Sequence, residues 1–111
     1  MIAICEKEPA CRDGRFCSGF LDASGSICRN LAEGFARFES VYIVQFFGYA
    51  LSSLTEVQDY LEESRLRRFI SQPEFDKLWD LSEHAKAKAL KFERPHRERL
   101  GKRRRRPRSE R

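Results

Sequence analysis

The chain has 111 residues, enough for one hydrophobic core but too few for two domains with a catalytic cleft between them. Its net charge of +5 is unevenly placed: residues 96–111 contain nine Lys and Arg against two Glu, whereas residues 1–95 contain 13 basic and 15 acidic residues. The pI near 9.3 therefore describes the end of the chain, and a uniformly basic domain is excluded.

The cysteines predict neither a metal site nor a disulfide scaffold. They fall at Cys5, Cys11, Cys17 and Cys28, and none forms the C-x-x-C pair typical of zinc sites. The short apolar run at the amino terminus is not a signal peptide, and no segment has the roughly 18 apolar residues of a membrane helix. We expect a cytoplasmic protein with reduced thiols, no cofactor, no catalytic or metal site, no membrane partner and no small-molecule substrate.

The first part of the chain predicts a lead-in followed by a long helix. Residues 1–12 contain Pro9 and show no helical period, so a poorly ordered segment is expected. From Asp13 to Phe38, apolar residues recur every three or four positions, which predicts a helix with Ile27, Leu31, Phe35 and Phe38 in the core. Gly34 is either a point of close helix contact or the start of the helix end.

Two further helices follow. Ser40 is expected to cap the second, which is apolar on more than one stripe and should lie between two partners. Ser71 and Glu74 form a capping box that begins the third helix, and Pro95 is expected to end it. Residues 96–111 then form a disordered basic tail.

These elements predict an all-α fold, an up-down antiparallel helical bundle over residues 13–95, because short connections force neighbouring helices to run antiparallel. The chain contains nine Phe, more apolar surface than three helices cover for one another. Self-association or a missing fourth helix is expected.

Two motifs carry a family resemblance. The segments Ser26-Ile27-x-x-Asn30-Leu31-Ala32-Glu33-Gly34-Phe35-x-Arg37 and Phe46-x-x-x-Ala50-x-Ser52-Ser53-Leu54-x-Glu56-Val57 resemble four-helix-bundle proteins encoded in intervening sequences of bacterial 23S ribosomal RNA genes. The resemblance implies a homo-oligomer, often a pentamer around a pore, without established enzymatic activity. A related group, the basic accessory proteins of diversity-generating retroelements, associates with nucleic acid, which by analogy makes RNA or DNA the expected ligand.

The chain departs from the family pattern in three places. Cys28 replaces a helix-kinking proline, and the family's first helix, about twenty residues before Pro9, is absent. The chain thus either begins late or represents a three-helix form. The basic tail inherits nothing from the resemblance.

The basic run is the main candidate site, since guanidinium groups bind phosphates without sequence preference. Its nucleic-acid-binding residues are Lys102, Arg103, Arg104, Arg105, Arg106 and Arg108. The alternative is a solvated tail that binds polyanions incidentally, leaving the bundle as a protein–protein interaction module. The residues of the two family motifs that are expected to have a structural role are Asn30, Glu33, Gly34, Phe35 and Glu56. The three polar ones are expected either to form a polar cluster inside the bundle or at the oligomer pore, or to fix the helix register by hydrogen bonds.

Overall fold

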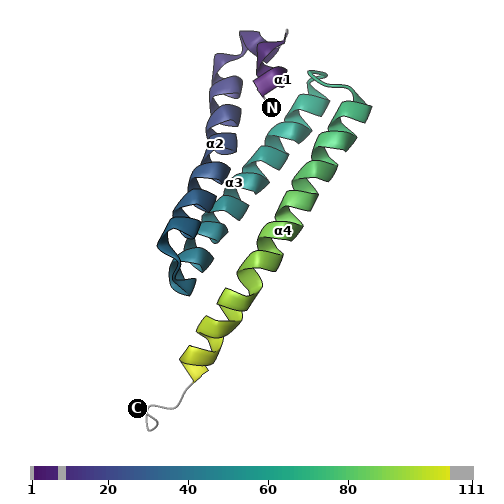
Figure 1. Cartoon of the computed structure of the whole chain (residues 1–111). Coiled ribbons are helices and arrows are strands. Elements are labelled where there is room, and N and C mark those ends of the chain that lie inside the picture. Colours follow the sequence, from purple (N-terminus) through teal and green to yellow (C-terminus); the bar gives the residue numbers. More distant parts are fainter. Residues whose placement is uncertain (1, 8–9, 106–111) are drawn as a thin grey trace.

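The computed structural model describes residues 2–7 and 10–105, and all regular secondary structure within these residues is helical. Three long helices, α2 (Gly14–Arg37), α3 (Ser40–Leu66) and α4 (Gln72–Arg105), follow a short helix α1 (Ile2–Glu6) and a 3-10 turn η1 (Ala10–Arg12). The long helices run antiparallel to their chain neighbours (Figure 1). The predicted all-α, up-down bundle is confirmed.

Helix α3 is the central helix, as its apolar surface predicts. It packs along both α2 and α4, and its buried residues face in more than one direction. The main core lies at the end of the bundle where α2 begins and α3 ends. This core consists of Ile4, Cys5, Ala10, Phe16, Phe20, Ala23, Val57, Leu61, Ile70 and Phe75.

The beginning of α2 and its Gly34 behave as the sequence suggests. Asp13 accepts a hydrogen bond from the backbone N–H of Phe16 at 2.9 Å, which caps the helix. Gly34 is buried in close contact: a Cβ there would lie 3.1 Å from Cδ1 of Phe47. The helix continues past it to Arg37, so Gly34 permits close packing rather than ending the helix.

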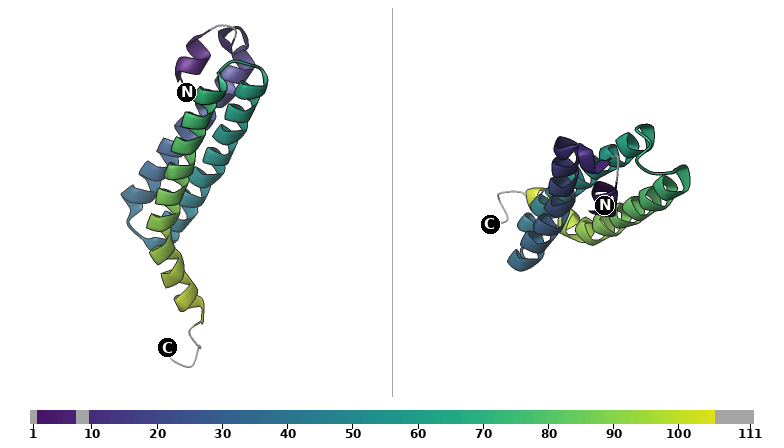
Figure 2. Two further views of the ribbon diagram at one scale, coloured as in Figure 1. Left: turned by 90° about the vertical axis from the view of Figure 1, so that its right-hand side faces the viewer. Right: turned by 90° about the horizontal axis from the view of Figure 1, so that it is seen from above.

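The segment expected as a poorly ordered lead-in contains two helical elements. Ile4 and Cys5 of α1 and Ala10 of η1 are buried in the core, and the Cys17 thiol lies 3.3 Å from the Ala10 carbonyl oxygen. Seen from above, α1 lies between the upper ends of α2 and α4 (Figure 2, right). Pattern analysis missed α1 because five residues are too few to show a helical period.

The predicted end of α4 at Pro95 is wrong, because the helix runs on to Arg105. Pro95 cannot donate the backbone hydrogen bond that would reach the Lys91 carbonyl. When other contacts hold the next turn in place, such a proline bends the helix instead of ending it. Here His96 Nδ1 lies 2.9 Å from the Ser40 hydroxyl oxygen, and Arg97 pairs with Glu93 across the proline. Figure 2 (left) shows α4 changing direction in its yellow-green third.

The two predicted caps have different outcomes. The Ser71 box is confirmed, since the Ser71 hydroxyl accepts from the Glu74 N–H at 3.2 Å and Glu74 accepts from the Ser71 N–H at 3.2 Å. Ser40 is not a cap: Glu39 holds that position without a side-chain hydrogen bond. The Ser40 hydroxyl is instead bonded across the bundle to α4.

Candidate nucleic-acid interface and oligomer surface

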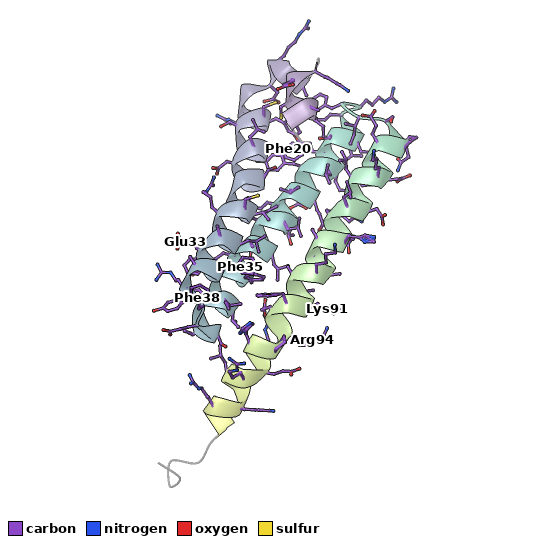
Figure 3. The ribbon with its side chains drawn as sticks, in the orientation of Figure 1. Phe20, Glu33, Phe35, Phe38, Lys91 and Arg94 are labelled. Carbon is purple, nitrogen blue, oxygen red and sulfur yellow. The ribbon has the colours of Figure 1, made fainter. Side chains whose placement is uncertain are left out.

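The first of the basic residues predicted to bind nucleic acid lie on helix α4. Lys102 and Arg103 are exposed on the last turns of α4, whose backbone continues through Arg104 and Arg105. Arg106 and Arg108 lie outside the described residues. Residues 86–105 contain ten Lys and Arg against two Glu, so the basic segment begins about ten residues before the predicted tail of residues 96–111. Figure 3 shows Lys91 and Arg94 on the stretch of α4 beside the end of α2.

One of the two acidic side chains in this stretch is removed from the surface. Glu93 is only 1% exposed, and while one carboxylate oxygen pairs with Arg97, Oε2 is buried without a hydrogen-bond partner. Glu98 is therefore the exposed carboxylate of residues 86–105, while the Glu93 carboxylate is paired with Arg97.

A polar contact between α3 and α4 fixes the geometry of the basic end. The Ser40 hydroxyl is bonded to the His96 ring at 2.9 Å and accepts from an Arg99 NH group at 3.3 Å. Sequence reasoning missed Glu93 and His96 because it placed the helix end between them. Their spacing of three, one helical turn, was the available signal.

Beside this contact, at the α2–α3 turn, the surface is hollowed. The hollow is lined by Phe38, Glu39, Ser40, Val41, Arg99 and Arg103. Phe38 was expected in the core, but its side chain is 84% exposed. That expectation was wrong because Phe38 follows the last residue of α2 and adopts a left-handed conformation that turns it off the helix face.

An open apolar groove lies between the lower halves of α2 and α4, which meet there through Phe35 and Phe92, with ring centres 5.0 Å apart. Phe35 is 50% exposed and Phe92 42%, although both rings contact Phe47 of α3. The groove is lined by Leu31, Phe35, Phe47, Ala85, Lys88, Ala89 and Phe92. The prediction that Phe35 is buried fails because α1 covers only the upper end of this gap (Figures 1 and 3).

The three polar residues of the family motif do not cluster within one chain. Asn30 donates to the Ser26 carbonyl one turn earlier, Glu33 pairs with Arg37, and Glu56 is exposed on α3. The cross-helix bonds are made by other residues. Ser53 donates to Ser26 at 2.8 Å, and Gln58 donates to Ser82 at 2.9 Å.

The candidate reactive side chains among the described residues are Cys5 and the adjacent pair Glu83 and His84. Burial first, and then the hydrogen bond with Cys17, raises the pKa of the Cys5 thiol to about 12, so it is protonated at neutral pH and a poor nucleophile. The Glu83 carboxylate accepts a hydrogen bond from the Gln58 side-chain amide at 2.8 Å. Among the described residues, no three His, Cys, Asp or Glu side chains converge as metal ligands.

The helical bundle and its two motifs agree with the family comparison. The model of the 23S rRNA-intervening sequence protein family matches residues 1–90. The chain belongs to this family. No curated protein and no solved structure matches it.

The family match separates two parts of the site. The matched residues include α1, the α2–α3 turn and every groove residue except Phe92. The match does not include the basic end of α4 from Lys91 onward. No helix described in this family member is long and apolar enough to cross a membrane.

Proposed function

We propose that the protein is a non-enzymatic, homo-oligomeric scaffold that acts in the cytoplasm and associates with RNA or DNA without sequence preference. The observation that carries the proposal is the concentration of positive charge on the last turns of α4. Ten cations stand on twenty residues, one of the two carboxylates among them is buried, and the remaining 85 residues before this stretch are acidic overall. Such a separation of charge favours phosphate binding at one end of the molecule.

The homo-oligomer is supported by the open groove between α2 and α4. Phe35 and Phe92 keep about half of their surface in water in the single chain. Burying apolar surface stabilises an association by about 25 cal/mol per Å². A second chain that covered this groove would therefore gain free energy without any rearrangement of the core.

The nucleic-acid association is tested by fluorescence anisotropy with a labelled RNA oligonucleotide across a salt series. The variant replaces Lys102, Arg103, Arg104, Arg105, Arg106 and Arg108 by Gln. Substitution is preferable to truncation at Pro95, which would also remove the bonds that His96 and Arg99 make to Ser40. A control neutralises three exposed cations at the other end, Arg12, Arg15 and Arg68.

We expect the wild-type affinity to fall steeply with salt, and the Gln variant to bind more weakly with a shallower slope, because fewer counterions are released. The control variant keeps most of the affinity. Equal binding by the wild type and the Gln variant would leave the alternative function, a protein–protein interaction module whose basic end has no nucleic-acid role. Light scattering tests the oligomer: a monomer mass at micromolar concentration contradicts it.

A further inference from the structure

The α2–α3 turn exposes an aromatic ring, because Phe38 is the C-cap of α2 and adopts the left-handed conformation that glycine usually adopts at helix ends. Phe38 has φ of 62°, the left-handed region that favours glycine and is unfavourable for bulky side chains. Its ring is 84% exposed, so packing does not compensate for the strained backbone. A residue that costs backbone strain and exposes apolar surface is better explained by a contact with another molecule.

The surroundings of Phe38 indicate the chemistry of that molecule. Val41, which is 49% exposed, lines the hollow together with Phe38 and adds a second apolar side chain to it. Arg99 and Arg103, one helical turn apart on α4, also line the hollow, and Arg99 donates a hydrogen bond to the Ser40 hydroxyl at 3.3 Å. Glu39 is the acidic residue of the lining. An exposed ring beside two guanidinium groups matches a nucleotide, which combines a flat base with an anionic phosphate.

We propose that this hollow binds an unpaired nucleotide of a single-stranded nucleic acid, with the base stacked on Phe38 and the flanking phosphates bound by Arg99 and Arg103. The inference rests on the proposed nucleic-acid function and names its site and the form of its ligand. It makes the end of the bundle, rather than the tail alone, the place where the strand is held. Single strands are favoured over duplexes because a base inside a duplex has no free face for stacking.

The charge of the region favours nucleic acid over a membrane or another protein. The hollow opens beside the stretch in which ten cations face two carboxylates. Membrane insertion usually requires a continuous apolar face on a helix. Here a single ring and Val41 project among charged side chains, which is the pattern of a stacking platform within a phosphate-binding surface.

The central test is the variant Phe38→Gly, which separates binding from stability. Glycine adopts a positive φ without strain, so the variant should be more stable than the wild type, with a Tm higher by about 2–6 °C. Its affinity for a labelled single-stranded oligonucleotide should fall about 5- to 100-fold, because a stacked base is lost. A packing role for the Phe38 ring predicts a loss of stability, and a role confined to the C-cap of α2 predicts the same gain, but neither predicts a change in binding.

A matched control is available at the α3–α4 turn. Arg68 is the other described residue with a positive φ that is not glycine, at 60°. Arg68→Gly should raise stability in the same way, and it removes a cation that lies away from the hollow. Its affinity for the single strand should stay within about twofold of wild type, since long-range charge effects are screened at physiological salt.

The charged residues of the hollow provide a second arm. Arg99→Gln with Arg103→Gln should lower the slope of log affinity against log salt by about 1.4, since about 0.7 counterions are released per single-strand phosphate contact. Glu39→Gln should strengthen binding by removing the repelling carboxylate. An unchanged slope in the double variant, or weaker binding by Glu39→Gln, counts against the placement of the phosphates.

The outcomes separate this inference from the function on which it rests. If the wild type binds no nucleic acid at low salt, the proposed function fails. If it binds but Phe38→Gly binds equally well, or if a duplex of the same sequence binds as tightly as the single strand, only the inference is overturned. Loss of binding to anionic phospholipid vesicles by Phe38→Gly, with oligonucleotide binding unchanged, would assign the ring to a membrane instead.

Discussion

The packing of α2 on α3 depends on the absence of a side chain at Gly19. A Cβ at this position would lie 2.0 Å from the Tyr60 hydroxyl oxygen and 3.0 Å from its Cζ, far inside normal contact distance. The Tyr60 ring cannot swing away freely. It stacks on Phe20 with ring centres 5.2 Å apart and meets the edge of Phe16 at 5.5 Å.

We predict that Gly19→Ala destabilises the protein by about 1–2 kcal/mol. Alanine in a helix interior gains about 1 kcal/mol over glycine. Against this, forcing an extra methyl group into a packed contact costs about 1–3 kcal/mol, and disturbing the Tyr60 stacking costs about 0.5–1.5 kcal/mol more. The steric cost therefore exceeds the gain in helix propensity.

The matched control is Gly48→Ala in α3, where a Cβ would meet nothing within 4 Å. This variant should be more stable than wild type by about 0.5–1 kcal/mol, since only the propensity gain applies. Tyr60→Phe in the Gly19→Ala background removes the closest contact and should restore part of the loss. Urea denaturation followed by far-UV circular dichroism measures all four proteins.

The result that refutes this reasoning is a Gly19→Ala protein at least as stable as wild type while Gly48→Ala gains as predicted. The two helices would then tolerate a side chain between them, and the close approach at Gly19 would not hold. A loss that Tyr60→Phe leaves unchanged would instead place the clash elsewhere.

Three further predictions concern Asp13, Glu93 and Phe35. The Asp13 carboxylate accepts a hydrogen bond from the first turn of α2 and pairs with Arg67, and these contacts lower the pKa of Asp13 in the folded protein. The stability that they contribute is present above the unfolded pKa of about 3.8 and is lost as the pH falls through the lower pKa of the folded protein. Denaturation at pH 6 and at about pH 3 should thus show a smaller drop in stability for Asp13→Asn than for wild type, and an equal drop would contradict the cap. Glu93→Met should raise the free energy of unfolding by about 1–2 kcal/mol, because it removes a buried oxygen without a partner, whereas the same change at the exposed Glu98 should have no effect in urea denaturation. Phe35→Asp, at a half-exposed groove position, should leave the circular dichroism spectrum unchanged and shift the mass measured by light scattering toward the monomer; an unchanged oligomer would exclude the groove as its interface.

The positions of the helices were largely predictable because local signals specify them. The box at Ser71 and Glu74 is formed by residues three positions apart, so the sequence predicted it directly. The N-cap at Asp13 has the same spacing to Phe16, although the sequence analysis used only the apolar period there. The apolar surface of α3 on more than one stripe likewise predicts a central helix, whatever the details of its partners. The same short-range patterns carry the family motifs.

The candidate site was only partly predictable. Lys102 and Arg103 were identified by composition, but their helical setting depends on contacts that carry α4 past Pro95. Those contacts join Ser40 to His96 and Arg99, which lie more than fifty residues away along the chain. A local rule for proline contains no information about such partners, so the end of α4 could not be read from the sequence.

By itself, the sequence determined the three long helices, their antiparallel order and the position of the positive charge, because these follow from periodicity, capping and composition. Only the tertiary structure decided which apolar residues are covered. Phe20 and Phe35 both belong to the apolar stripe of α2, yet Phe20 is fully buried and Phe35 is half exposed. The physical reason is that burial depends on what lies opposite. At the upper end of the gap between α2 and α4, α1 completes the core, whereas at the lower end Phe35 contacts Phe47 and Phe92 and lines an exposed groove.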